Sequence, residues 1–188
     1  MKLIKKIGIN LVLALLLATF AVSFAISAAS HEAEPERKSV THLARDESTQ
    51  VVLAAPKDSG IEHNAYRIIF SSDNFSGDMT FAKELSTALL EYDAPRLNYY
   101  SDSVADETKY EILFGNTNRT LSAELAEKCK NYTEFDALVW GFEFRDGKLA
   151  FAANSNEAFT RGAKEFTELY VKDGVLSVPS NLMKISYL

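Results

Sequence analysis

Two short polar segments hold the side chains in this sequence that are best suited to bind a ligand. One is Gly115-Asn116-Thr117-Asn118-Arg119 and the other is Asn154-Ser155-Asn156. Amides and hydroxyls both donate and accept hydrogen bonds, and a guanidinium can bind a carboxylate through two parallel bonds. Each segment ends an apolar run and precedes a helical pattern, so free N–H groups of a helix start would lie beside it. For a hydroxyl-rich or anionic ligand such as a uronic acid, the candidate binding residues are Asn116, Thr117, Asn118, Arg119, Asn154 and Asn156.

The same segments also have a purely structural interpretation. Asn, Ser and Thr side chains cap helix starts, and a third turn of this kind, Ser71 to Asn74, also precedes a helical pattern. Arg119 needs a partner, because the positive end of a helix dipole disfavours a cation. A carboxylate, Glu111 or Asp136, would close the turn onto the sheet, whereas an anionic ligand would be the functional reason. The sequence leaves both interpretations open.

We predict no catalytic residues, no metal ligands and no cofactor site. The three histidines are His31, His42 and His63, and Pro35 stands where an H-E-x-x-H motif needs its second histidine. The first two histidines lie in a polar stretch, and His63 alone offers no support for a Ser-His-Asp triad.

Three other features could carry chemistry but fit structural roles better. Glu124 with Glu127, and Glu165 with Glu168, lie on predicted helices near lysines, so we interpret them as surface charge pairs rather than an acid/base dyad. Trp140 could stack on a sugar, but its place on the apolar face of a predicted hairpin favours packing in the core.

Residues 1–29 are predicted to form a secretory signal peptide. Three lysines precede a run without charge from Ile7 to Ser30, and the small residues Ser27-Ala28-Ala29 suit cleavage. An uncleaved membrane anchor is the alternative, because the run is long enough to span a bilayer. The protein is therefore expected to be secreted or held at the cell surface, with membrane contact through this segment alone.

The net charge and the number of cysteines limit the possible partners and the route of export. Without residues 1–29 the chain has 17 basic and 26 acidic residues, a formal charge of −9. This charge argues against nucleic acid as a partner, because nucleic acid needs clustered positive charge. The single cysteine, Cys129, excludes an internal disulfide, which fits export from a bacterium better than passage through an endoplasmic reticulum.

The rest of the chain divides into a polar linker at 30–50, one domain at 51–179 and a tail at 180–188. Within the domain, apolar periodicity predicts strands at 51–55, 66–70, 96–100 and 110–114, helices at 79–92, 121–129 and 157–171, and a closing strand at 175–178. The predicted N-caps are Asp78, Thr120 and Asn154. Asp173-Gly174 is predicted to end the last helix.

A hairpin at 138–154 is the clearest local structure in the sequence. Asp146-Gly147 between two alternating runs is a strong signal for a type I′ turn, and a two-residue turn fixes the register of the strands. The predicted pairs are Phe144 with Leu149, Phe142 with Phe151, and Trp140 with Ala153. The order of elements predicts an α+β fold, in which helices pack on a mixed sheet of about five or six strands.

Residues 111–119, E-I-L-F-G-N-T-N-R, carry a family resemblance. They resemble the E-I-hydrophobic-x-G-x-T-x-R segment of the accessory domain that precedes the catalytic barrel in bacterial beta-N-acetylhexosaminidases and alpha-glucuronidases. The hairpin and helix start at 146–158 are similar to a later segment of that domain, although Ala153 and Asn154 stand where the family usually has a glycine pair. The likeness runs from about Tyr66 to Tyr170. It implies a topology similar to zinc metalloproteases without their metal site.

The resemblance implies an exported, non-catalytic accessory domain that contacts carbohydrate or a glycoside hydrolase chain. A catalytic barrel needs about 250 residues, which these 188 residues do not contain. Two alternatives are a fragment or partner of a separate glycoside hydrolase chain, and a small secreted enzyme with an unrecognised site.

Overall fold

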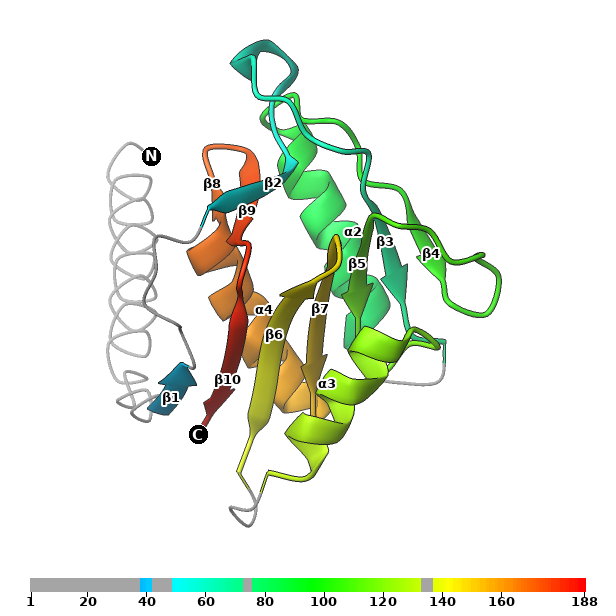
Figure 1. The fold of residues 1–188 in the computed structure, drawn as a ribbon, viewed down its shortest axis with the longest axis vertical. Helices are drawn as coiled ribbons and strands as arrows, with labels where there is room; N and C mark the ends of the chain where they lie inside the picture. The colour runs from blue at the N-terminus through cyan, green and yellow to red at the C-terminus, as the bar shows by residue number, and fades with distance from the viewer. Residues whose placement is uncertain (1–37, 42–48, 73–75, 133–136) are drawn as a thin grey trace, which may run out of the picture. The chain divides into compact units, whose positions relative to one another are not determined.

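The computed structural model describes residues 38–41, 49–72, 76–132 and 137–188. The predicted signal peptide, most of the predicted linker and Asp136 lie outside these residues. Figure 1 shows that the described part is built from two β-sheets and three α-helices.

Seven strands form the larger sheet. They are β1 (Lys38–Thr41), β3 (Arg67–Phe70), β4 (Tyr99–Ser101), β5 (Glu111–Phe114), β6 (Val139–Arg145), β7 (Lys148–Ala153) and β10 (Met183–Tyr187). Their order is β1-β10-β6-β7-β5-β3-β4. The group β7-β5-β3-β4 is parallel throughout, whereas β6, β10 and β1 add in antiparallel fashion. The sheet is therefore mixed, as predicted.

A smaller antiparallel sheet has the order β2-β9-β8. It consists of β2 (Gln50–Ala54), β8 (Val171–Lys172) and β9 (Val175–Pro179). A short 3-10 helix, η1 (Lys57–Ser59), follows β2. The predicted strands at 51–55 and 175–178 thus exist, but they pair with each other rather than joining the main sheet.

Three helices cover the two faces of the larger sheet. α2 (Ser76–Leu90) and α4 (Asn156–Tyr170) pack against each other on one face, and α3 (Thr120–Lys130) covers the opposite face (Figure 1). The helices that follow β3 and β7, which are α2 and α4, pack on the first face. The helix that follows β5, which is α3, packs on the second face, although β5 lies between β3 and β7 in the sheet. This arrangement of layers is α+β, as the sequence predicts.

Phenylalanine side chains fill the space between the sheet and the α2–α4 pair. The ring centroids of Phe151 and Phe159 are 4.2 Å apart in a stacked arrangement, and Phe142 lies 5.1 Å from Phe151. The other phenylalanines of this cluster are Phe81, Phe114 and Phe166. Because aromatic side chains remove large apolar areas from water, this layer supplies much of the stability of the domain.

The hairpin prediction is confirmed in every pair. Phe144 faces Leu149, Phe142 faces Phe151 and Trp140 faces Ala153. Asp146 and Gly147 both have positive φ, at 52° and 82°, as a type I′ turn requires. Trp140 is buried, so the prediction that it packs in the core rather than on the surface is confirmed.

Residues 170–188 differ from the prediction. Asp173-Gly174 does not end α4, which stops at Tyr170; it forms the turn of a second hairpin, between β8 and β9, with φ values of 50° and 74°. Residues 180–188, predicted to be a tail, include β10, which lies between β1 and β6 in the larger sheet. Residues 38–41 of the predicted linker form β1.

The predicted N-caps also need correction. α4 is capped by Ser155, whose hydroxyl accepts a hydrogen bond from the Ala158 N–H, and not by Asn154. Thr120 is the first residue of α3 and Arg119 is its N-cap. Asp78 is not a cap, because α2 begins two residues earlier and places it within the first turn. Among the described residues, every helix falls short of the length and apolarity that a transmembrane span needs.

Candidate functional site

The carboxyl ends of β3, β4, β5 and β7 meet at one edge of the larger sheet, because these strands are parallel. Both predicted polar segments lie at this edge, after β5 and after β7. The chain leaves β5 toward the face opposite to that taken after β3 and β7, and such a switch point is where ligands bind in open α/β sheets.

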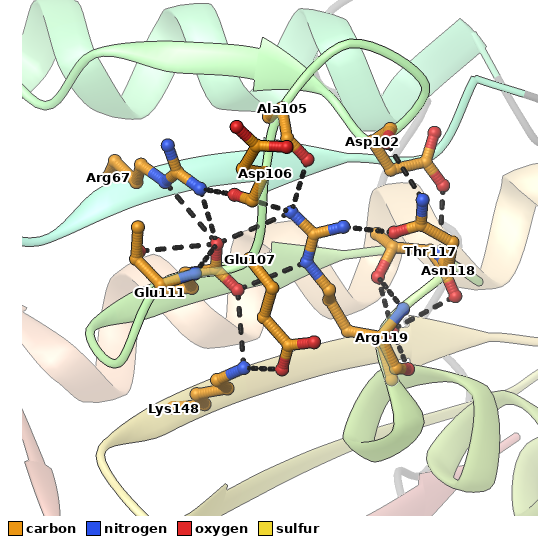
Figure 2. Close-up of polar contacts among 12 residues, drawn as sticks. Arg67, Asp102, Ala105, Asp106, Glu107, Glu111, Thr117, Asn118, Arg119 and Lys148 are labelled. Carbon is orange, nitrogen blue, oxygen red and sulfur yellow. Dashed lines mark hydrogen bonds and ion pairs between the residues drawn. The ribbon is translucent and has the colours of Figure 1, made fainter.

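A buried carboxylate stands in the middle of the segment with the family resemblance. Glu111 Oε1 accepts hydrogen bonds from Arg67 Nη2 at 2.8 Å and from the Thr108 N–H at 3.0 Å, and Glu111 Oε2 lies 3.2 Å from Arg119 Nε (Figure 2). Lys148 Nζ is 3.5 Å from the same Oε2 atom. Burial by itself would raise the pKa of Glu111, but the hydrogen bonds from Arg119 and Arg67 outweigh it and hold the pKa below its ordinary value.

Arg119 is fully engaged inside the fold. Its Nη2 donates to the backbone oxygens of Ala105 at 2.8 Å and Asp106 at 3.1 Å, and its Nη1 donates to Asn118 Oδ1 (Figure 2). All three guanidinium nitrogens therefore have acceptors, and only 4% of the residue is exposed. The prediction that Glu111 supplies the carboxylate partner is confirmed; Asp136, the other residue considered, lies outside the described residues.

Thr117 and Asn118 also form hydrogen bonds that stabilise the turn after β5. Thr117 is buried, its hydroxyl lies 2.5 Å from that of Ser122, and it accepts a hydrogen bond from the Arg119 N–H. Asn118 donates its backbone N–H to Asp102 Oδ2 and its side-chain amide to the Asp102 carbonyl, both at 2.9 Å. These bonds fasten the turn after β5 to the end of β4.

The two candidate residues after β7 also differ in whether their side chains are bound within the fold. The Asn154 side chain donates to the Ala137 carbonyl at 2.8 Å and accepts from the Val139 N–H at 3.0 Å, so it ties the end of β7 to the start of β6. Asn156, the first residue of α4, is exposed, and within the described residues its side chain makes no hydrogen bond. Asn116 is likewise exposed, and its side chain has no hydrogen bond within the same part of the chain.

The two exposed amides flank the place where the starts of α2 and α4 converge. A Cβ atom built on Gly77, the second residue of α2, would lie 2.9 Å from Asn156 Oδ1. A Cβ atom built on Gly115 would lie 2.0 Å from Asp78 Oδ2, so the turn that carries Asn116 rests directly on α2. We call Asn116, Asn156 and the intervening Gly77, Asp78 and Gly115 the polar rim.

A groove between α2 and α4 opens next to the polar rim. It begins at Gly77, and its floor includes Phe81 and Phe159. Hydroxyl and charged side chains line its walls: Thr80, Glu84, Thr160, Lys164 and Thr167.

Two residues at this edge were missed by sequence reasoning. Asp102 holds the Ser72 and Asn118 N–H groups through its two carboxylate oxygens, and its signal was a polar Ser-Asp-Ser segment after a short strand. Asp78 was predicted as a cap, whereas its carboxyl is buried and has no hydrogen-bond partner in the part of the chain that the structure describes. Elsewhere, Glu165 is not a surface charge as predicted: it is buried and accepts hydrogen bonds from Trp140 Nε1 and Lys184 Nζ.

The described residues contain no group of three or more His, Cys, Asp or Glu side chains that could hold a metal ion. His63 is partly exposed, and its Nδ1 atom lies 3.0 Å from the backbone oxygen of Asn64. The geometry thus separates the candidate residues into four that are bound within the fold, Thr117, Asn118, Arg119 and Asn154, and two that present exposed amides, Asn116 and Asn156.

No family model and no curated protein matches the sequence. Among solved structures, one similar chain is that of "Structure of CpGH84D", a glycoside hydrolase. The alignment covers 83% of this chain and 22% of that chain, with 11% sequence identity and a TM-score of 0.39. This chain thus has a weak structural similarity to a glycoside hydrolase chain and spans less than a quarter of its length.

The tightness of the contact between Gly115 and Asp78 can be tested by comparing the loss of unfolding free energy when each of two glycines is replaced by alanine. Gly115 and Gly60 both have positive φ, at 79° and 70°, but a Cβ atom on Gly60 would meet nothing within 4 Å. Gly60→Ala is expected to cost about 1–2 kcal/mol of backbone strain. Gly115→Ala is expected to cost about 1–3 kcal/mol more, because the methyl group displaces a packed carboxyl. Urea unfolding measures both; equal losses would show that the turn does not rest on α2.

Proposed function

We propose that this chain is an exported, non-catalytic accessory domain that binds uncharged oligosaccharide at the polar rim and works beside a glycoside hydrolase domain. The observation that carries the proposal is that Asn116 and Asn156, alone among the predicted set, present exposed amides at the switch point of the sheet that make no hydrogen bond to the described residues. An amide offers both a donor and an acceptor, which matches the hydroxyl groups of a sugar.

An uncharged ligand fits the electrostatics better than an acidic one. The guanidinium of Arg119, which the sequence offers to a uronic acid, already binds Glu111 and three backbone or side-chain oxygens. The chain carries a formal charge of −6, and this charge repels anions at long range. The helix starts at the rim attract negative charge, but the Asp78 carboxyl beneath them offsets that attraction whenever it is ionised.

The link to a glycoside hydrolase rests on the segment at 111–119. Its resemblance to an accessory domain fits the structure in one respect: the motif residues Glu111, Thr117 and Arg119 hold the turn in place and leave the neighbouring amides exposed. The partner catalytic domain would lie on the same polypeptide or on a separate chain. Export would follow from the apolar segment at 7–30.

A glycan array of neutral and acidic oligosaccharides tests the proposal. We expect the wild-type protein to retain neutral glycans, and the double variant Asn116→Ala/Asn156→Ala to lose about fivefold to a hundredfold in affinity, because each lost hydrogen bond to a sugar contributes about 0.5–1.5 kcal/mol. Asn64→Ala is the matched control, since Asn64 is exposed near the amino end of β3, away from the rim. Absence of binding at millimolar glycan, or selective retention of acidic glycans, would contradict the proposal.

A further inference from the structure

Asp78 is a buried acid at the centre of the polar rim. It is fully buried, and among the described residues neither of its carboxylate oxygens has a hydrogen-bond partner. It belongs to the first turn of α2, and its Oδ2 atom packs against Gly115, which lies between β5 and Asn116. Its neighbour Gly77 packs against Asn156. The side chain therefore contacts the turn that carries Asn116, and the residue before it in α2 contacts the side chain of Asn156.

Burial disfavours the charged form of this carboxyl. Removal from water raises the pKa of Asp78 from 3.8 to about 7. The charged side chains on the surrounding described elements are Lys83 and Glu84 on α2, Asp102 after β4, Glu111 at the start of β5, Arg119 after β5, and Glu157 and Arg161 in the first two turns of α4; Lys164, Glu165 and Glu168 lie further along α4. Lys83 and Glu84 are exposed, Asp102 and Arg119 are bound within the β4–β5 network, and Glu157 pairs with Arg161 at 3.1 Å.

We propose that Asp78 is an acid-dependent latch: uncharged, it lets the turn after β5 close on the start of α2, and its ionisation opens that contact. The latch regulates the polar rim, because opening moves the turn that carries Asn116 away from the helix starts that carry Asn156. The effect of the latch on ligand binding rests on the proposed function. The opening of the turn after β5 does not depend on it.

The direction of the pH effect follows from proton binding. The closed state holds the Asp78 proton more tightly than an open, hydrated state, whose carboxyl ionises near 3.8. Opening therefore becomes more favourable as pH rises from about 4 to about 7, and above that range it changes no further. Between pH 5 and pH 8 the opening constant is expected to rise about a hundredfold.

Amide hydrogen exchange at pH 5 and pH 8, corrected for intrinsic rates, measures this opening. The reporters are the Gly115 N–H, which bonds Phe151 O at 2.9 Å, and the Ser71 N–H, which bonds Phe114 O at 3.0 Å. In the wild-type protein their opening constants should rise about a hundredfold. In Asp78→Asn, which cannot ionise, they should stay constant within a factor of about three, while Glu157→Gln, a neighbouring exposed acid, should behave as wild type.

Two results would overturn the latch. One is an equal rise in Asp78→Asn, which would assign the effect to another group. The other is an opening constant at pH 8 that is the same for Gly115 as for the Phe144 N–H, which bonds Leu182 O on another part of the sheet; ionisation would then unfold the whole domain rather than open the turn. The neutral glycan retained on the array should bind more weakly at pH 8 than at pH 5 in the wild type and equally in Asp78→Asn. If no glycan binds, the proposed function fails, and the exchange rates still decide the latch.

Discussion

Replacing Arg119 with alanine is expected to lower the free energy of unfolding by about 3–5 kcal/mol. The change leaves Glu111 buried with one strong partner removed, frees the Ala105 carbonyl and leaves the Asp106 carbonyl to Arg67 alone. Loss of one member of a buried ion pair costs far more than loss of an exposed pair, because the remaining charge has no water to compensate it.

Chemical denaturation at pH 7 measures this loss, with Arg96→Ala as the control because Arg96 is exposed. The effect should shrink in acid. The lowered pKa of Glu111 means that its ionised form contributes stability above its unfolded pKa, and this contribution is lost as pH falls through the folded value. Near-wild-type stability together with lost binding of acidic glycans would reverse the assignment and make Arg119 a ligand-binding residue.

Phe142→Ala is expected to cost about 3–5 kcal/mol, the range for removal of a fully buried aromatic side chain. Phe142 has no exposed surface, and its ring centroid lies 5.1 Å from Phe151, 5.6 Å from Phe166 and 5.7 Å from Tyr170. The alanine would leave a cavity between β6 and α4 that these rigid rings cannot fill by small shifts.

Phe144→Ala is the matched control, because Phe144 follows on the same face of β6 but is partly exposed. We expect it to cost less than half as much. Urea unfolding monitored by the fluorescence of Trp140 suits both variants, since this single tryptophan is buried on the same strand. A loss below about 1 kcal/mol for Phe142→Ala would mean that the aromatic layer repacks.

The sequence predicts the hairpin at Asp146-Gly147 fully, because everything that determines it is local. A two-residue turn with positive φ fixes the register, and the alternation of aromatic and polar residues then determines the buried face. The partner of Arg119 is predicted only in part: a cation at a helix start is unfavourable on electrostatic grounds and needs a carboxylate, but the sequence offers both Glu111 and Asp136 and leaves an anionic ligand open.

The second Asp-Gly pair shows where local signals fail. Asp173-Gly174 after an apolar helical stripe suits a helix end as well as a hairpin turn, since both need positive φ. The outcome is decided by the pairing of β9 with β2, a strand from the opposite end of the domain sequence. β10 has an alternating apolar pattern at Met183, Ile185 and Tyr187, but a short run at the end of a sequence gives no indication of the strand it will pair with.

The sequence predicts the candidate site as a set of residue types. Long-range contacts decide which of these residues are bound within the fold and which stay exposed. Asn118 and Asn154 look no different in sequence from Asn116 and Asn156. The first two find partners in Asp102, Ala137 and Val139, which the sequence does not bring near them. The burial of Asp78 follows from the packing of α2 against the turn at Gly115, which no local pattern encodes.

We propose that Asn116 and Asn156 bind carbohydrate while the neighbouring motif residues hold the fold. A nitrogen–proton NMR titration with a neutral oligosaccharide tests it most directly. We predict that the side-chain amide signals of Asn116 and Asn156 shift together, while the Arg119 Nε–H and Trp140 indole signals, bound to Glu111 and Glu165, stay in place. Unchanged amide signals at millimolar sugar, or a shift of the Arg119 signal instead, would contradict the claim.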